Sequence, residues 1–179
     1  MGTPACPIPG MSSHLETLGQ LLLESTRQVL EEAGVPILEA SACAPAGDWA
    51  APMAVIGFGG ETVRGSISFE VPWRVLSASH PTKSLLADDL VDWVGELSNL
   101  VVGTLKTRLR GNSVTIQPGI PMRFTTREAE RGATSPPQLQ YRLRAADGSI
   151  LVRFSAEIQS TFEMGTSTQP EVVHGIEIF

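Results

Sequence analysis

The sequence predicts an α+β fold in which a mainly antiparallel sheet carries long packed helices. Two long stretches with apolar residues at helical spacing are each followed by segments that alternate apolar and polar residues, as strands do. Short turn sequences join several of these strands, and such turns form antiparallel hairpins rather than parallel crossovers. A helix followed by about three strands occurs twice, which indicates two pseudo-repeated units in one domain.

A helix and three strands make up the predicted first half. The helix spans residues 12–33, and it ends because Gly34 and Pro36 do not continue a helix. Its apolar residues at helical spacing are Leu15, Leu18, Leu22 and Val29. Three strands are predicted after it, over residues 37–42, 53–58 and 63–71. Gly59 and Gly60 supply the turn between the last two strands.

The predicted second half begins with a short helix over residues 72–79, which opens on a proline. A long helix follows over residues 88–110; two aspartates stand at its start, and Gly111 ends it. Further strands are predicted over residues 113–117, which can continue near 122–124, and over 139–145 and 150–158. Asp147 and Gly148 form a typical hairpin turn between the last two strands.

The chain is expected to hold one domain over residues 12–162, because 179 residues with 42% hydrophobic content suit a single core. Residues 1–11 form a proline-rich leader that we expect to be disordered, and residues 125–137 form a polar loop. Residues 163–179 show no clear periodic pattern, so the structure of this tail stays open. No apolar run approaches the roughly 18 residues that a membrane span needs, and the start lacks the features of an export signal. We therefore expect a cytoplasmic protein without a membrane segment.

Charge and motifs exclude several kinds of partner and cofactor. The 13 basic and 19 acidic residues give a net charge of −6, which disfavours nucleic-acid binding. The densest basic group, Lys106, Arg108 and Arg110, fits the stabilisation of a helix end better than a nucleic-acid patch. The three histidines do not lie at metal-ligand spacing, and no nucleotide-binding glycine loop is present. We therefore expect no metal and no organic cofactor on this chain.

The long helix carries the candidate functional residues. Its sequence reads DDLVDWVGELSNLVVGTLKTRLR, and one broad apolar face is predicted to pack on the core. That face comprises Leu90, Trp93, Val94, Leu97, Leu100, Val101 and Leu105. The opposite polar row comprises Asp92, Glu96, Asn99, Gly103 and Lys106. By spacing alone, such a row is most often an ordinary solvated helix face.

The segment from Glu96 to Gly103 indicates more than a solvated face. Gly103 costs the helix about 1 kcal/mol relative to alanine, which indicates that a partner protein or a neighbouring helix approaches the backbone there. The string ELSNLVVG resembles the E-x-x-N-x-x-x-G signature on the long helix of CheX and CheC phosphatases. The hairpin over residues 55–69 and the late hairpin at Asp147 are similar to that family too, so the resemblance covers residues 12–160.

The resemblance implies a protein aspartyl-phosphate phosphatase that dephosphorylates a CheY-like response-regulator receiver domain. It implies that Glu96 docks to the receiver's lysine and that Asn99 orients the attacking water. Asp92, Gly103 and Lys106 lie in the same row and are candidate partner contacts. The phosphorylated receiver would supply the Mg²⁺ ion, so the implied chemistry needs no cofactor on this chain.

Only one such motif is present in the sequence. On the first helix, Glu16 is followed three residues later by Gly19, and Glu24 by Arg27, so a second E-x-x-N is missing. This favours the CheX branch, whose members form homodimers, over the two-site CheC and the flagellar FliY types.

Two residues ahead of the motif, Trp93 and Gly95, depart from what is most usual in the family. An alternative function therefore stays open, in which a CheX-like domain binds a receiver or another signalling protein without hydrolysis. A flagellar switch component is a third, weaker interpretation, because no additional domain is evident in the sequence.

Overall fold

The computed structural model describes residues 13–43, 51–124 and 138–165. Within them, three helices lie against a seven-stranded sheet. The helices are α1 (Ser13–Glu32), α2 (Trp73–Ser79) and α3 (Ala87–Gly111). The strands are β1 (Glu39–Ala42), β2 (Met53–Gly59), β3 (Val63–Glu70), β4 (Gln117–Pro118), β5 (Met122–Phe124), β6 (Leu139–Ala145) and β7 (Gly148–Ile158). The predicted leader 1–11, the polar loop 125–137 and residues 166–179 of the tail lie outside the described residues.

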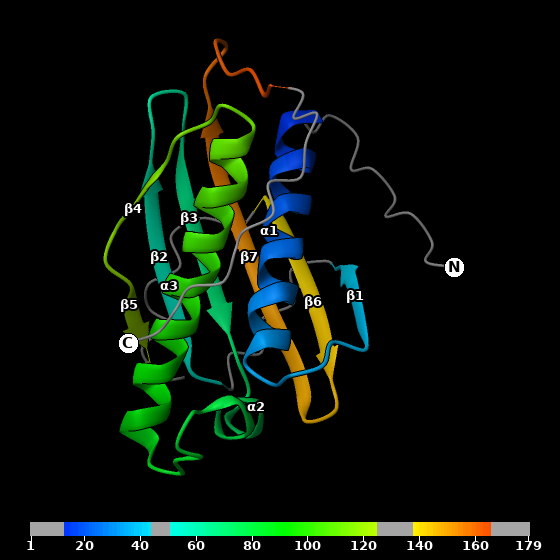
Figure 1. Ribbon diagram of the computed structural model, residues 1–179, viewed down its shortest axis with the longest axis vertical. Helices are drawn as coiled ribbons and strands as arrows, with labels where there is room; N and C mark the ends of the chain where they lie inside the picture. Colours follow the sequence, from blue (N-terminus) through cyan, green and yellow to red (C-terminus); the bar gives the residue numbers. More distant parts are fainter. Residues whose placement is uncertain (1–12, 44–50, 125–137, 166–179) are drawn as a thin grey trace.

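The sheet is antiparallel at every pairing that the described residues make. Its order is β1-β6-β7-β3-β2-β4, and β5 also pairs with β2. Figure 1 shows α1 and α3 side by side on one face of the sheet, with α2 near one end. The α+β fold with long helices on a mainly antiparallel sheet is therefore confirmed. The repetition of a helix plus three-strand unit stays a prediction.

Both predicted hairpins are confirmed. In the β2–β3 hairpin Ile56 lies opposite Ile67, and in the β6–β7 hairpin Leu143 lies opposite Ile150. At the second turn Gly148 has a φ of 144°, a conformation that glycine adopts readily and other residues rarely do. Glycine geometry therefore sets the second connection. In the first hairpin Gly59 belongs to β2, so the connection runs over residues 60–62.

The strand predicted over residues 113–117 is wrong for most of its length, because only its last residue belongs to β4. Ser113 has a positive φ of 64°, and the N–H of Val114 donates to the Leu109 carbonyl at 2.9 Å. The chain thus turns back against the end of α3. Val114 and Ile116 are buried, so their alternation reflects contact with the core and not pairing in the sheet.

The hydrophobic core lies between the two long helices and one face of the sheet. On central strand β7, Phe154 stacks on Phe58 of β2 with ring centroids 6.0 Å apart, and both rings are buried. From the helices, Leu22 and Val101 belong to the same buried cluster. This packing decides which side of α3 faces the sheet and which side faces outward.

The opposite face of the sheet carries a buried polar network. Arg153 on β7 donates through Nη1 and Nη2 to Oε2 of Glu70 at 3.1 Å, and through Nε to Oε1 of Gln140 at 3.1 Å. All three side chains are buried. Because a buried charge is costly unless it is paired and hydrogen-bonded, this network joins β3, β7 and β6 through mutually satisfied groups.

Tyr141, the single tyrosine of the chain, lies on β6 beneath α1. Its side chain is buried, and Gly19 of α1 leaves room for it, since a Cβ at position 19 would lie 2.2 Å from the Tyr141 hydroxyl oxygen. Burial, together with the nearby negative charge of Glu16, raises the pKa of Tyr141 to about 12.

Tyr141 should titrate near its raised pKa in the folded protein, at about 12, and near the ordinary value of 10.0 in concentrated guanidinium. Because the fold favours the neutral phenol, its stabilising contribution is complete below the unfolded pKa and is lost as the pH rises through the folded pKa. Tyrosinate absorbance, followed together with circular dichroism, measures both values. The Tyr141→Phe variant should lose the absorbance change. Titration near 10.0 with native circular dichroism would contradict the assignment.

Candidate functional site

The predicted polar row lies along the outer side of α3. Asp92, Glu96, Asn99 and Gly103 are exposed, and Lys106 is half-buried. On the opposite side of the helix, Leu97 and Val101 are buried in the core. The Glu96 carboxylate and the Asn99 carboxamide are thus carried outward, one helical turn apart, by a helix anchored along its whole length.

Leu100 was predicted to face the core, and this is wrong, because 52% of its surface is exposed. The apolar arc of α3 is centred on Val94 and Val101, and Leu100 lies at the margin of that arc. Leu100 follows Glu96 by four residues, so the two side chains are neighbours on the helix surface. An exposed apolar side chain therefore borders the polar row.

Gly103 has open space around it. A Cβ built at this position would meet nothing within 4 Å, so no neighbouring helix approaches the backbone there within the described parts of the chain. One of the two explanations predicted for this glycine, a packed helix, is therefore wrong. Approach by a partner protein stays a prediction.

Trp93 is half-buried rather than fully in the core. Its Nε1–H donates to the hydroxyl oxygen of Ser79 on α2 at 2.9 Å, and its ring lies edge-on to His80 with centroids 5.6 Å apart. Nδ1 of His80 in turn accepts the backbone N–H of Thr82 at 3.2 Å, in the connection that leads to α3. These contacts tie α2 and the connection to the first turns of α3.

Arg123 on β5 reaches the polar row from the edge of the sheet, a contact that residue spacing did not predict. Arg123 lies opposite Ala54 of β2 in the sheet, and both side chains point toward α3. Its Nη1 forms an ion pair with Oδ1 of Asp92. Farther along the same side of the helix, Lys106 donates to Oε1 of Gln117 at 3.3 Å. Both contacts depend on the pairing of β4 and β5 with β2, which residue spacing does not predict.

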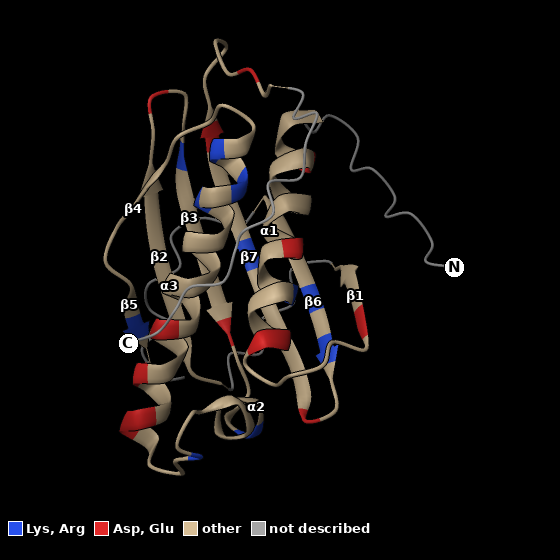
Figure 2. Ribbon diagram, in the orientation of Figure 1, with Lys and Arg blue, Asp and Glu red and all other residues tan. Residues whose placement is uncertain are grey.

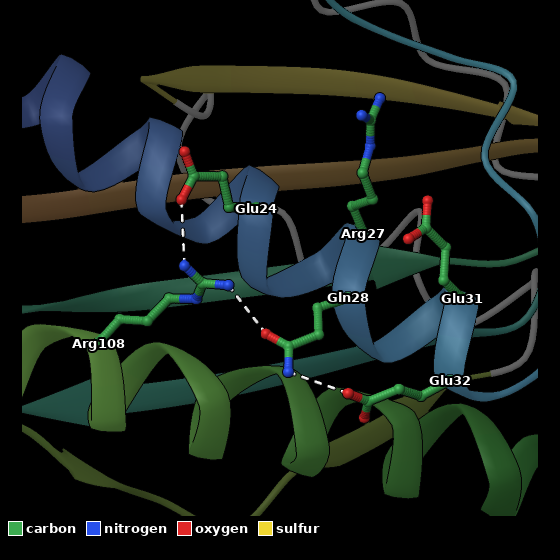
Figure 3. A pocket seen from close by; sticks show the side chains of 6 residues that line it. All are labelled: Glu24, Arg27, Gln28, Glu31, Glu32 and Arg108. Carbon is green, nitrogen blue, oxygen red and sulfur yellow. Dashed lines mark hydrogen bonds and ion pairs between the residues drawn. The ribbon is translucent and has the colours of Figure 1, made fainter. Parts of the chain in front are cut away.

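A pocket of about 540 Å³ lies along the second half of α1, and Arg108 of α3 closes one side of it. It is lined by Glu24, Arg27, Gln28, Glu31, Glu32 and Arg108 (Figure 3). Arg108 binds Glu24 at 3.2 Å and Gln28 at 2.8 Å, and Gln28 donates to Glu32 at 2.9 Å. This network joins the two helices about three turns beyond Glu96 and is separate from the polar row.

The described residues hold no group of three or more side chains suited to binding a metal ion. Nor does any helix among them have the length and apolar character needed to cross a bilayer. What α3 presents is a carboxylate, a carboxamide and flanking charged groups on an outward surface. Such groups can bind a charged partner and orient a water molecule, but they include no activated nucleophile of their own.

The fold is that of CheX and CheC-like proteins. The CheX structure from Desulfovibrio desulfuricans aligns with a TM-score of 0.64 at 20% identity, over 79% of this chain and 99% of that one. A CheC-like superfamily protein from Shewanella sp. PV-4 aligns with a TM-score of 0.64 at 17% identity, over 82% and 99% of the two chains. A chain of the CheX–CheY–BeF3–Mg²⁺ complex from Borrelia burgdorferi gives 0.64 at 16% identity, over 78% and 97%. The sequence itself matched no protein-family model and no curated protein.

Proposed function

We propose that this protein is a CheX-type phosphatase of the cytoplasm, which removes the phosphoryl group from the aspartyl-phosphate of a CheY-like receiver domain. The observation that carries the proposal is the joint exposure of Glu96 and Asn99 on α3 of a CheX-like fold. The open backbone at Gly103, one turn beyond Asn99, agrees with a partner that lies along this helix. A CheY-like partner is supported by the fold shared with the Borrelia complex, which contains CheX and CheY.

The proposed mechanism assigns different tasks to the two motif residues. Glu96 pairs with the receiver's lysine and so positions α3 over the phosphorylated aspartate. The Asn99 carboxamide donates to and accepts from one water molecule and holds it in line with the phosphorus–oxygen bond. The water attacks phosphorus, the aspartate carboxylate leaves, and inorganic phosphate is released. No covalent intermediate on this chain is needed, and the receiver provides the Mg²⁺ ion.

The proposed reaction needs no deep pocket on this chain. The reacting bond belongs to the receiver, so a convex helix that carries two side chains can complete a site located on the partner. This geometry agrees with the outward position of the motif on α3. Lys106 and Asp92 flank the motif and are proposed as further partner contacts.

The proposal is tested with receiver domains from the same organism, each phosphorylated by a small-molecule phosphodonor in the presence of Mg²⁺. The loss of phosphate from each receiver is followed with and without catalytic amounts of this protein. We expect at least one receiver to lose its phosphate faster. Stable binding of a receiver without any acceleration would instead support the binding-only alternative.

We expect a homodimer, since CheX relatives with one motif are dimeric and both sheet edges offer exposed apolar groups. Leu38 beside β1 is 64% exposed, and Ile120 beside β5 is 89% exposed. Light scattering at micromolar concentrations should give twice the monomer mass. A Leu38→Lys or Ile120→Lys change should favour the monomer only if that edge forms the interface. A monomer mass up to millimolar concentration would contradict the prediction.

A further inference from the structure

Arg123 occupies a specific place beside the motif. Its guanidinium pairs with Asp92, and its aliphatic stem lies over Gly95, where a Cβ would come within 2.8 Å of Arg123 Cδ and 3.2 Å of Cγ. Asn99 follows Gly95 by four residues, so these two positions are adjacent on the helix surface. The arrangement places a positive group beside the first part of the polar row, at Asp92 and Gly95.

The absence of a side chain at position 95 is what admits Arg123 to this place. Gly95 is buried although it lies toward the outer side of α3, because the arginine stem covers it. Glycine in the middle of a helix is unfavourable relative to alanine, so the helix gives up stability at this position. The structure associates that loss with the position of Arg123.

The pairing of Arg123 leaves its guanidinium able to bind a partner. Its side chain is 45% exposed and that of Asp92 is 67% exposed, and an ion pair this exposed is weak. A guanidinium has five N–H donors in a planar fork, more than one carboxylate oxygen can use. Arg123 can therefore bind a second anionic group without leaving Asp92.

Arg123 is a cation beside an otherwise acidic part of α3. The first half of α3 carries Asp88, Asp89, Asp92 and Glu96, and Figure 2 shows the basic segment of β5 beside this acidic part of the helix. The site of a phosphorylated receiver offers anionic groups, because it holds a phosphoryl group and the acidic oxygen ligands around Mg²⁺. Arg123 offers these groups a cation, which the first half of α3 itself lacks.

We propose that Arg123, placed by Gly95 and Asp92, binds the acidic rim of the receiver's phosphorylation site and determines which receivers dock on α3. This inference rests on the proposed function and adds a cation to the motif pair Glu96 and Asn99. Arg123 acts in docking and does not touch the attacking water. Its loss should therefore raise KM, while kcat stays close to that of the wild type.

The test measures KM and kcat for a receiver that the wild-type protein has been shown to dephosphorylate, at several salt concentrations. Arg123→Met keeps the aliphatic stem and should raise KM about tenfold at low salt and weaken the salt dependence of kcat/KM. Arg123→Lys should recover part of this loss, since it restores the charge without the fork. Arg64→Met is the matched control, because Arg64 makes an exposed ion pair with Glu157 on the other face of the sheet.

The Gly95→Ala variant distinguishes a defect in docking from a loss of stability. The added methyl group should displace the Arg123 stem and raise KM, while thermal stability stays equal or rises because alanine favours the helix. An Arg123→Met variant with the KM and salt dependence of the wild type would overturn the inference and leave the proposed function intact. A wild-type protein that accelerates dephosphorylation of no receiver would overturn both.

Discussion

Replacing Asn99 with alanine should lower the rate of phosphate release from a bound, phosphorylated receiver about 100-fold, the size of effect seen when one transition-state hydrogen-bond donor is removed. The amide is the group that we propose to hold the water in line with the breaking bond. Because the side chain is exposed, its truncation opens no cavity, and alanine favours the helix. Single-turnover release at saturating phosphatase isolates this step, since docking no longer limits the rate.

Controls on the same helix make the Asn99 experiment specific. Thr107→Ala alters another exposed residue of α3 and should release phosphate at the wild-type rate. Asn99→Asp keeps the shape but loses the N–H donors, so it should be impaired like the alanine variant. Glu96→Ala should differ, because higher phosphatase concentration should partly restore its rate. Equal stimulation by the wild type and Asn99→Ala would refute the catalytic role of Asn99.

Replacing Phe154 with alanine should lower the free energy of unfolding by about 3–5 kcal/mol. Phe154 is 1% exposed on central strand β7 and stacks on Phe58 at an interplanar angle of 4°. Its removal leaves a cavity beneath the helices that the surrounding strands cannot close. A loss of this size is a large share of the roughly 5–15 kcal/mol that stabilises a typical domain.

Chemical denaturation followed by circular dichroism measures the Phe154 effect, provided that the unfolding is two-state. Phe154→Leu should cost less, because leucine fills part of the space. Arg64→Met should change stability by less than about 1 kcal/mol, since its ion pair with Glu157 is exposed on both sides. A Phe154→Ala variant as stable as Arg64→Met would show that β7 does not organise the core as described.

The Asn99 and Phe154 experiments test how the exposed motif depends on the packed core beneath it. A partner can bind the motif productively only if α3 keeps a fixed position and orientation on the sheet. The packed core beneath the helix provides this. Leu97, between Glu96 and Asn99 in sequence, is 2% exposed and anchors this turn. Core damage should therefore lower activity through loss of folded protein, whereas loss of Asn99 lowers the rate of the folded protein itself.

Local pattern by itself determined a substantial part of this protein. The long helices, both hairpins and the polar row from Asp92 to Lys106 follow from residue spacing, because side-chain direction repeats with a fixed period along a helix or strand. The roles of Glu96 and Asn99 came only from the resemblance of their segment to a family motif. Spacing alone favoured a solvated surface there.

Tertiary structure decided the contacts of Arg123, the exposure of Leu100 and the path of the chain before β4. These features depend on residues that are distant in sequence. Arg123 reaches Asp92 and Gly95 only because β5 pairs with β2 at the sheet edge beside α3. The same packing left Leu100 outside the core and turned the residues before β4 against the end of α3 instead of into the sheet. Periodicity says which residues share a side, but the order of strands and the placement of helices on them decide what each side meets.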